Sequence, residues 1–348
     1  MKVFEYESVA ESYADIIKYI WENGNEVSPR GMLTKEVTPA TIVINNPRKR
    51  VIDHPIRKLN YGFMIGELFW ILQGKNDASS IAHYNKQWLN YSDNGETLNG
   101  AYGQRIFNAD GGDALFSNEE GKYDVFKIQI NQFNEVFKKL KNDNHSRQGT
   151  ISMFDPAKDF NETKDVPCTN LLRFSIRDGK LNMLVVMRSN DIIFGTPYDI
   201  YNFTMLQEIM AGLLEVEVGK YTHVVDSLHL YETHFELAKE IINHQYEDVY
   251  NNFEPMDARL KGEELDKVTN LTFNIENITR ETGDVVEIPF LVEQISSIEN
   301  EYWRSIVALI ATYNVRKAKR SQEEIDELKS LVTNEFKGLI SKWNELKK

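Results

Sequence analysis

The residues best suited to chemistry in this sequence lie between residues 166 and 198. The only cysteine, Cys168, stands in the motif Pro-Cys-Thr-Asn, and a polar cluster, Arg-Ser-Asn-Asp, begins at Arg188 after an apolar run. A thiolate is a strong nucleophile, and a guanidinium group beside a thiol lowers the thiol pKa. A fold that brought these two side chains together would create a compact reactive site.

A β-hairpin is the element expected to bring them together. Residues 174–176 and 181–187 favour strands, and they flank Asp178 and Gly179, a pair typical of a tight hairpin turn. Cys168 stands before the first run and Arg188 directly after the second. Pairing of the two strands would place the thiol and the cation at one end of the hairpin.

Three further candidates lie elsewhere in the chain. Glu67 belongs to residues 61–73, which are apolar almost all round and predict a buried helix, where desolvation should raise the carboxyl pKa. An acid satisfied by a neighbouring donor is the alternative. His229 lies in a predicted strand, where a lone histidine is more often structural. Arg30 follows turn residues, and a solvated loop charge is the alternative there.

The rest of the pattern predicts an α+β protein. Apolar residues at helical spacing predict helices over residues 7–23, 124–141, 202–214 and 232–242. Short β-rich runs predict strands over residues 41–44, 150–154 and 223–231. Residues 79–104, which are polar and rich in aromatic residues, are expected to form a loop that lines a cleft. Strands and helices without regular alternation favour a mixed sheet with packed helices over a doubly wound sheet.

The chain is expected to divide into a catalytic domain, residues 1–250, and a mostly helical C-terminal region, residues 251–348, that packs on it. The C-terminal region predicts one short strand, residues 271–275, and a long final helix with a capping box at Ser321 and Glu324. The apolar stripe of this helix consists of Ile325, Leu328, Val332, Phe336, Leu339, Trp343 and Leu346. Such a stripe packs on the body of the protein or on a second subunit.

Composition narrows the class of protein. The chain has 348 residues, 41% of them hydrophobic, and a net charge of −13, so it can bury a substantial core and lacks the cationic surface that binds nucleic acid nonspecifically. One cysteine forms no intramolecular disulfide, and no secretory signal or run of about 20 apolar residues is present. A cytoplasmic protein without membrane or direct nucleic-acid partners is expected. The sequence also shows no metal-ligand spacing.

Together, the candidate residues resemble the motifs of the thymidylate synthase family. The shared elements, in this order, are Glu67, Tyr102-Gly103, Ser146-Arg147, Cys168, Arg188-Ser189 with Asp191, Gly195, and His229 with Tyr231. The resemblance covers most of residues 7–245. Within the family, the motifs CTN, MRSND and SLHLY are most similar to the deoxycytidylate hydroxymethylases of phages.

The resemblance implies a reaction at C5 of a pyrimidine nucleoside monophosphate. Cys168 would add to C6 of the base and make C5 nucleophilic. The co-substrate 5,10-methylenetetrahydrofolate would supply a one-carbon unit, and no metal would take part. Capture of water gives a hydroxymethyl group, whereas hydride transfer from the folate gives a methyl group.

The resemblance also implies roles for individual residues. Glu67 would organise water and move protons beside Cys168. The nucleotide would be bound by Arg30, Arg188 and Ser189 at the phosphate, by His229 and Tyr231 at the sugar hydroxyl, and by Asn170. Arg147 would reach the phosphate from the other subunit of a homodimer. The folate would be bound by Tyr84, Trp88, Asp191 and Gly195.

Asp199 is the residue expected to choose the base. Thymidylate synthases have an asparagine here, whose amide matches O4 and N3–H of uracil, whereas a carboxylate accepts from the N4 amino group of cytosine. The resemblance therefore favours dCMP as the substrate. A helix N-cap before Ile200 is a compatible alternative role for Asp199.

The sequence also departs from the family pattern. Gln148 replaces a usual second arginine, Asp226 and Ser227 replace a Gly-Asp pair, and helices follow where the synthases end in a short folate-closing tail. The last departure favours hydroxymethylation over hydride transfer. The alternatives are a hydroxymethylase of the ribonucleotide CMP, a thymidylate synthase or another C5-methylating enzyme, and a catalytically silent paralogue that binds nucleotides.

Overall fold

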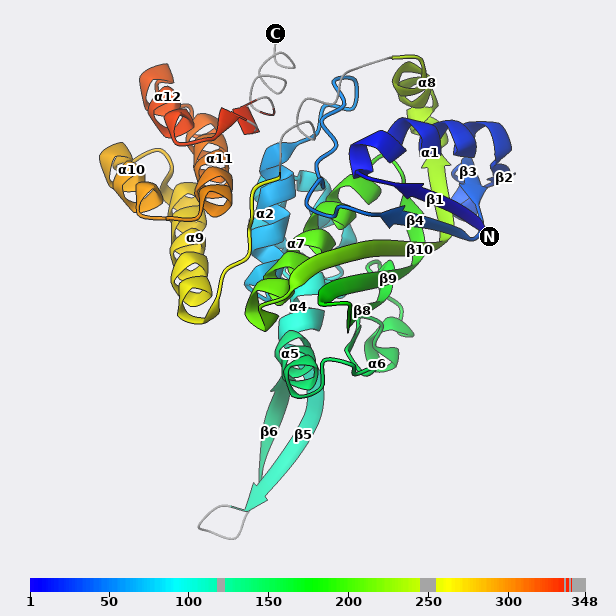
Figure 1. The fold of residues 1–348 in the computed structure, drawn as a ribbon, viewed down its shortest axis with the longest axis horizontal. Coiled ribbons are helices and arrows are strands. Elements are labelled where there is room, and N and C mark those ends of the chain that lie inside the picture. Colours follow the sequence, from blue (N-terminus) through cyan, green and yellow to red (C-terminus); the bar gives the residue numbers. More distant parts are fainter. Residues whose placement is uncertain (118–122, 245–254, 335, 338, 340–348) are drawn as a thin grey trace.

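A computed structural model describes residues 1–117, 123–244, 255–334, 336–337 and 339 of the protein. Within these residues the central element is an eight-stranded mixed sheet (Figure 1), which confirms the predicted α+β class. Its path is β1 (Lys2–Tyr6), β4 (Ala40–Ile44), β10 (Glu217–Tyr231), β9 (Lys180–Asp191), β8 (Thr169–Arg177) and β7 (Thr150–Ser152). Two short strands, β2 (Asn25–Val27) and β3 (Thr34–Val37), join it where β3 pairs with the end of β10.

The predicted hairpin is confirmed as β8 and β9. The strands join at Asp178 and Gly179, which have positive φ values of 52° and 72°, as a two-residue hairpin turn requires. β10 runs parallel to β9, with Ser227 opposite Ser189 and His229 opposite Asp191. The polar ends of β9 and β10 therefore lie side by side at the same end of the sheet.

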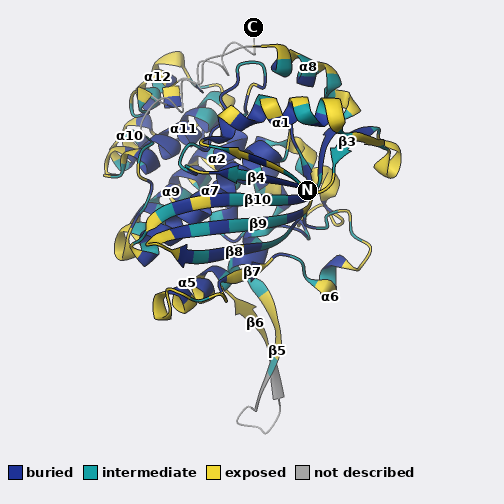
Figure 2. Cartoon of the chain, turned by 45° about the vertical axis from the view of Figure 1, so that its right-hand side comes forward, coloured by how far each residue is buried: buried dark blue, intermediate teal, exposed yellow. Residues whose placement is uncertain are grey.

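Two apolar helices, α2 (Tyr61–Leu72) and α7 (Thr196–Leu214), form a buried layer beside the sheet (Figures 1 and 2). Asn60 caps α2 by accepting the N–H of Phe63 at 3.1 Å. α7 begins at Thr196, earlier than predicted, and nearly all of its side chains are buried because it lies between the sheet and other helices. Near the edge of the sheet that β1 forms, α1 (Val9–Asn23) packs on β1 and on α8 (Phe235–Asn243).

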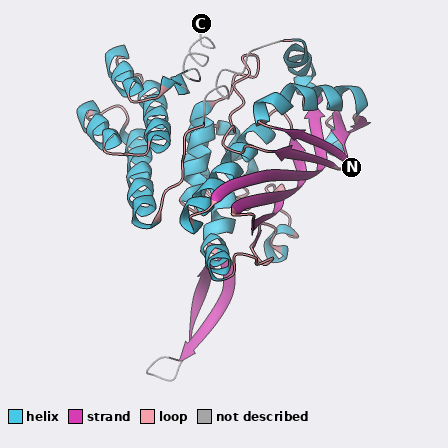
Figure 3. Ribbon diagram, in the orientation of Figure 1, coloured by secondary structure: helices cyan, strands magenta, loops and turns pink. Residues whose placement is uncertain are grey.

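The C-terminal helices lie on the side of α2 away from the sheet, as Figure 3 shows. They are α9 (Gly262–Thr282), α10 (Ile288–Ser296), α11 (Glu301–Lys317) and α12 (Gln322–Ser330). α9 and α11 pack against α2, and α10 and α12 pack against α11. α11 approaches α2 at Gly62, where the missing side chain leaves room for the ring of Tyr313. The predicted boundary at residue 250 lies outside the described residues, so the division of the chain there stays a prediction.

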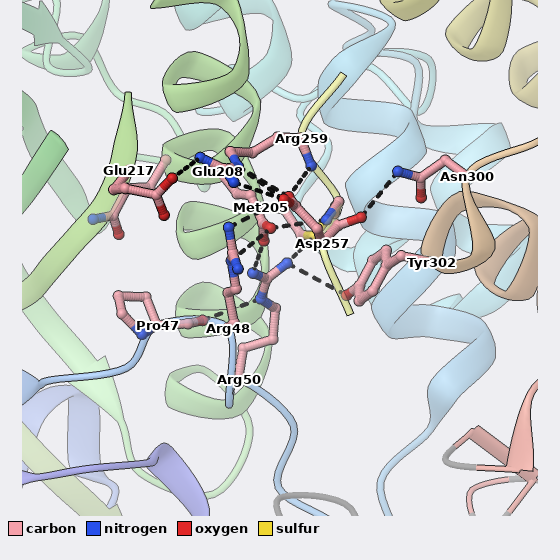
Figure 4. Close-up of polar contacts among 12 residues, drawn as sticks. Pro47, Arg48, Arg50, Met205, Glu208, Glu217, Asp257, Arg259, Asn300 and Tyr302 are labelled. Carbon is pink, nitrogen blue, oxygen red and sulfur yellow. Dashed lines mark hydrogen bonds and ion pairs between the residues drawn. The ribbon is translucent and has the colours of Figure 1, made fainter. Parts of the chain in front are cut away.

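A buried ion-pair cluster joins the segment before α9 to α7 (Figure 4). Glu208 on α7 is fully buried and pairs with Arg50 and, at 3.0 Å, with Arg48. Its Oε1 also accepts the backbone N–H of Ala258 at 2.8 Å. A buried carboxylate is tolerated only with such partners. The cluster thus connects three segments that are far apart in the sequence.

One predicted helix, residues 124–141, is wrong over its first half. Residues 124–130 belong to β6 (Tyr123–Ile130), which pairs with β5 (Ala109–Ser117) in an arm that projects from the body (Figure 1). In β6 the apolar residues Phe126, Ile128 and Ile130 alternate with polar ones, which is the period of a strand. The helix that follows, α5 (Gln132–Asn142), begins after Asn131, whose side chain accepts the N–H of Asn134 at 2.9 Å.

Three other local predictions are corrected. Residues 271–275 are not a strand but lie inside α9, whose buried face includes Val268, Thr272 and Ile275.

The predicted final helix keeps its capping box but ends at Ser330. Helical residues resume at Asn334, and Trp343 and Leu346 lie outside the described residues. Residues 79–104 are not one loop. They include most of α3 (Ala78–Tyr84), η2 (Lys86–Tyr91) and the start of α4 (Tyr102–Phe107). The remaining short elements are η1 (Pro29–Gly31), α6 (Pro156–Asp159) and η3 (Glu232–His234).

Candidate active site

A cavity of about 940 Å³ lies where β9 and β10 end, beside the first turn of α7 and one side of α2. Ligand sites usually measure about 300–1,000 Å³, so this cavity has room for more than one ring system. Most of the predicted site residues line it. They are Arg30, Glu67, Tyr84, Trp88, Cys168, Arg188, Ser189, Asp191, Gly195, Asp199, His229 and Tyr231.

Cys168 and Arg188 are neighbours in this cavity. The backbone N–H of Arg188 donates to the carbonyl of Cys168 at 2.9 Å, and Nη2 lies 3.7 Å from Sγ. The guanidinium also donates to the carbonyls of Pro167 at 3.1 Å and Val166 at 2.9 Å, which holds the chain before Cys168 in place. The hairpin thus brings the thiol and the cation together, as the sequence predicts.

The net shift of the Cys168 pKa is opposite to the predicted one. Burial raises the pKa of the thiol above its usual value, and this effect exceeds the lowering by Arg188 and Arg30. The charge of Asp199 raises the pKa further. At neutral pH the free protein therefore holds Cys168 mainly as the thiol, which must lose its proton before it can act as a nucleophile.

Glu67 extends from α2 into the same cavity. Its Oε2 accepts a hydrogen bond from Nδ2 of Asn202, on α7, at 2.8 Å. Burial, assisted by the charge of Asp199, raises the pKa of Glu67 to about 8, in the predicted direction. A carboxyl whose pKa lies near neutrality can both accept and release a proton at this position.

Asp199 stands in the first turn of α7 and faces the cavity. Burial raises the pKa of Asp199 to about 7, and the hydrogen bond that Nδ2 of Asn190 donates to Oδ2 at 2.8 Å opposes this shift. The alternative role as an N-cap is wrong, because α7 begins at Thr196 and its N-cap residue is Gly195.

Polar groups gather where the loop at Arg30 meets the ends of β9 and β10. Arg30 has a left-handed backbone with φ of 53°, a conformation that costs a non-glycine residue about 1 kcal/mol or more. Nδ1 of His229 donates to the carbonyl of Ser227 at 3.1 Å, which leaves Nε2 as an acceptor in the neutral ring. The hydroxyl of Ser227 donates to Glu36 at 2.6 Å.

Aromatic side chains form another wall of the cavity. Trp88 lies against Phe63 and Trp70, with ring centroids 6.4 and 6.2 Å away. Tyr84 also lines the cavity and donates from Oη to Glu276 of α9 at 2.7 Å. The carboxylate of Asp191 accepts the N–H of Ile193 at 2.7 Å. A flat heteroaromatic ring with polar edges fits such a wall.

Two predicted site residues do not line this cavity. Arg147 is exposed after α5, and its carbonyl accepts from Nη2 of Arg173 at 3.2 Å. Asn170 lies on β8, where its carbonyl accepts the N–H of Met153 at 2.9 Å. Contact between Arg147 and a ligand would therefore require the cavity of another copy of the chain.

Several residues without a predicted role contribute to the site. Arg57 is buried and donates from Nε to the carbonyl of Ile193 at 2.9 Å, which fixes the turn before α7. Asn202 contacts Glu67, Asn190 contacts Asp199, and His223 contacts Asn190. Only Asn190 carried a signal in the sequence, as part of the polar cluster after the second strand.

Among the described residues, His, Cys, Asp and Glu side chains do not gather in groups of three that could hold a metal ion. Within the same residues, every helix is too short or too polar to cross a membrane. The expected absence of a metal and of a nucleic-acid partner, and the cytoplasmic location, stay predictions.

Known proteins match most of this chain. The family model described as thymidylate synthase matches residues 11–282, a range that includes every cavity residue named above. A protein of Bacillus phage SP01 named deoxyuridylate hydroxymethyltransferase is 35% identical over 234 residues, which cover 66% of this chain and 59% of the phage protein. A protein of the same name from Pseudomonas phage M6 is 30% identical over 236 residues, 67% of this chain and 62% of the phage protein.

A third relative comes from an archaeon. The putative thymidylate synthase of Methanothermobacter marburgensis is 29% identical over 240 residues, which cover 68% of this chain and 96% of that protein. The match to this chain thus spans nearly the whole archaeal protein but less than two thirds of either phage protein.

Proposed function

The chain belongs to the thymidylate synthase family, and we propose that it transfers a hydroxymethyl group to C5 of a pyrimidine deoxynucleoside monophosphate, with dCMP as the substrate. The observation that carries the proposal is a single cavity that holds Cys168, Arg188, Glu67 and Asp199. The names of the two phage relatives support hydroxymethyl transfer rather than methyl transfer.

Cys168 is the nucleophile in this proposal. Its sulfur forms a bond to C6 of the base, and the electron pair of the C5–C6 double bond makes C5 nucleophilic. After C5 has gained the one-carbon unit and lost its proton, the folate would leave as tetrahydrofolate and water would add to the transferred carbon. The bond between the sulfur and C6 then breaks and the thiolate leaves. The reaction involves no net oxidation, because the one-carbon unit is already at the oxidation level of formaldehyde, water supplies the oxygen and the C5 hydrogen leaves as a proton.

Glu67 is the group that moves protons. It projects into the cavity that holds Cys168, and its pKa of about 8 allows it to change protonation state near neutrality. Through ordered water it would accept the C5 proton and orient the water that becomes the hydroxyl group. Asn202 holds the carboxyl in place from α7.

The cavity also fits a folate co-substrate. When bound, 5,10-methylenetetrahydrofolate supplies a one-carbon unit at the oxidation level of formaldehyde. Trp88, Tyr84 and Phe63 offer an aromatic wall for its pterin ring, and Asp191 and Gly195 lie at the margin of the same cavity. Its volume of about 940 Å³ is large enough for a nucleotide and a pterin together.

The nucleotide phosphate is assigned to the end of the cavity that holds Arg30, Arg188 and Ser189, since guanidinium groups pair well with phosphate oxygens. His229 and Tyr231, one strand away, are assigned to the sugar hydroxyl. Arg147 lies outside the cavity of its own chain, so the proposal includes a homodimer in which it serves the other subunit.

The carboxylate of Asp199 supports cytosine as the base. In its ionised form it accepts from the N4 amino group and favours a proton on N3, whereas it repels O4 of uracil. The second candidate is dUMP. It is favoured by the names of the phage relatives and by the pKa of Asp199 near 7, because a protonated carboxyl offers one donor and one acceptor, as an amide does.

The test is a comparison of three C5-tritiated nucleotides, dCMP, dUMP and CMP, each incubated with the protein and 5,10-methylenetetrahydrofolate. Tritium should enter water fastest from dCMP, and mass spectrometry should find a hydroxymethyl product. Faster release from dUMP would support the second candidate, and equal or faster release from CMP would contradict the deoxynucleotide assignment. Nucleotide binding without release from any substrate would identify a silent paralogue.

A further inference from the structure

A buried chain of hydrogen bonds ends at Asp199. Oη of Tyr221 lies 2.7 Å from Nδ1 of His223, and Nε2 of His223 lies 3.1 Å from Oδ1 of Asn190. Nδ2 of Asn190 then donates to Oδ2 of Asp199 at 2.8 Å. All three side chains are buried: Tyr221 and His223, on β10, do not line the cavity, and Asn190, on β9, is part of its lining. We call these three residues the relay.

The direction of the hydrogen bonds in the relay follows from chemistry. Nδ2 of Asn190 points at Asp199, and Oδ1 lies 2.6 Å from the hydroxyl of Thr196 and 3.1 Å from Nε2 of His223. The hydroxyl of Thr196 also lies 3.1 Å from the carbonyl of Asp191, so the charge of Asp199 is what determines the orientation of the amide. The opposite amide orientation would place its oxygen against Oδ2, which repels as long as Asp199 is ionised.

His223 is held neutral, and the orientation of Asn190 then determines which of its ring nitrogens carries the proton. Burial lowers the pKa of His223 to about 3. With one proton on the ring, Nε2–H donates to Asn190, and Nδ1 accepts from the hydroxyl of Tyr221. Each member of the relay thus orients the next one.

We propose that Tyr221, His223 and Asn190 are positioning residues that commit one oxygen of Asp199 to the protein and leave the other for the base, so that the relay is a second determinant of the choice between cytosine and uracil. The inference rests on the proposed function, in which Asp199 reads the base. Tyr221 and His223 do not line the cavity and act only through Asn190 and Asp199, whereas Asn190 is itself part of the lining.

The surroundings of Asp199 make this donated hydrogen bond important. The groups whose pKa values respond to its charge are Glu67 on α2, Tyr102 on α4, Cys168 before β8 and Tyr221 on β10. All four are acids, so none of them compensates a negative charge. The first turn of α7, where Asp199 stands, and the N–H of Asn190 favour its ionised form.

Loss of the relay should therefore raise the pKa of Asp199, which favours its protonated form, and should allow its carboxyl group to rotate. A protonated carboxyl no longer repels O4 of uracil, so discrimination against dUMP should weaken. A hydrogen bond to a charged group contributes enough to change the ratio of the two substrates by roughly tenfold. The pH at which the preference for dCMP develops should also move upward, because ionisation of Asp199 becomes harder.

The decisive variant is Tyr221→Phe, which removes only the terminal hydroxyl, and His223→Gln and Asn190→Ala test the next two positions. The ratio of kcat/KM for dCMP to that for dUMP is measured as a function of pH. Tyr302→Phe is the matched control, because it removes a buried hydroxyl that contacts Tyr201 and Arg50 away from the cavity. Asn190→Ala, which removes the hydrogen bond to the charged group, should lower the ratio roughly tenfold, and Tyr221→Phe and His223→Gln, which remove hydrogen bonds between neutral groups, should lower it about two- to tenfold. All three should raise the midpoint of the pH dependence, whereas the control should change neither the ratio nor the midpoint.

Equilibrium binding of dCMP and dUMP provides a second measure of the same ratio that requires no turnover. If Tyr221→Phe folds and both the ratio and its pH dependence stay at the wild-type values, the proposed role of the relay in the choice of base is refuted. Equal losses for both nucleotides with an unchanged pH dependence would also overturn it, because they indicate a structural role alone. A wild-type protein that releases no tritium from any nucleotide would refute the proposed function, and the binding ratio would still decide on the relay.

Discussion

Cys168, Glu67 and Asp199 are three acids whose pKa values are raised mainly by burial in one cavity. The charge of Asp199 also raises the pKa values of the other two. Simultaneous ionisation of all three is unfavourable, because like charges repel and the walls are poorly solvated. The cavity therefore favours states that keep at least one proton among them, which suits a reaction in which protons move between substrate and protein.

Arg188→Gln should make Cys168 harder to ionise. Arg188 is the strongest of the groups that lower the thiol pKa, so its loss raises that pKa further. The thiolate is the reactive form, and the rate of alkylation by iodoacetamide should therefore rise at higher pH in the variant than in the wild-type protein. Arg173→Gln, on the neighbouring strand β8, is the control and should leave the profile unchanged. A profile that stays in place or moves to lower pH would contradict the coupling.

Asp199→Asn should move base preference toward dUMP by roughly 10- to 100-fold, because an amide matches uracil and leaves the amino group of cytosine poorly paired. In the wild-type protein the preference for dCMP should increase as the pH rises through about 7, where Asp199 ionises. The variant cannot titrate there, so its ratio should be flat with pH. Tritium release from both nucleotides measures this, and an unchanged ratio would remove Asp199 from base recognition.

The sequence predicted the residues that project into the cavity better than those behind it. Cys168 and Arg188 stand in short motifs whose chemistry is recognisable from residue types alone, whereas Asp199 was found through the resemblance to the thymidylate synthase family. His223 and Asn202 act through contacts with residues that are distant in the sequence, such as Asn202 with Glu67. The pKa of Cys168 is raised because the thiol is buried, and the extent of burial depends on the packing of the whole fold.

At the scale of elements, α9 and α11 support the aromatic wall of the cavity from behind. Glu276 of α9 accepts the hydroxyl of Tyr84 at 2.7 Å and pairs with Arg280 at 2.8 Å. Nδ2 of Asn314, on α11, donates to the same hydroxyl at 3.1 Å. The C-terminal helices thus hold in place a residue that lines the site.

Glu276→Ala should loosen this wall. It removes the acceptor of the Tyr84 hydroxyl and the buried carboxylate that pairs with Arg280, which keeps Asn277 as an acceptor at 2.7 Å, and should cost about 3 kcal/mol of unfolding free energy in urea. We expect the KM for folate to rise more than the KM for the nucleotide, since Tyr84 belongs to the aromatic wall. Glu281→Ala removes an exposed partner of Arg280 and should cost less than about 1 kcal/mol. Equal effects of the two variants would show that the buried contact is unimportant.

The errors in predicted elements have physical causes. In residues 124–141 the apolar residues fit both a helical and a strand period, and the cap at Asn131 is what separates β6 from α5. Residues 271–275 resemble a strand locally, but the buried residues before and after them continue at helical spacing through α9. Long amphipathic elements such as α1 were predicted well because one period extends over their whole length.

At the scale of the molecule, the position of Arg147 allows a test of the proposed homodimer. Cys168→Ala and Arg147→Ala should each lose activity, but a mixture refolded together should form hybrid dimers with one intact site. Random association would restore roughly a quarter of wild-type tritium release. Each variant refolded alone is the control. No recovery in hybrids of confirmed composition would contradict a shared site.

The cluster around Glu208 should contribute strongly to stability. Glu208→Gln leaves the buried guanidinium of Arg50 without its carboxylate, which should cost about 3–5 kcal/mol of unfolding free energy in urea. Glu217→Gln breaks an exposed pair with Arg259 and should cost less than about 1 kcal/mol. A similar cost for the two variants would show that the cluster does not anchor the segment before α9.

The packing of α2 against α11 has a consequence for biosynthesis. α2 is apolar on nearly every side, and one of its sides is covered by Tyr313, which leaves the ribosome roughly 240 residues after α2 does. At about 5–20 residues per second, that interval lasts on the order of 10–50 s. During this time the side of α2 that Tyr313 later covers is exposed to water, and an exposed apolar helix is a binding site for chaperones. The yield of folded protein should therefore depend on chaperone supply more than on the stability of the finished molecule.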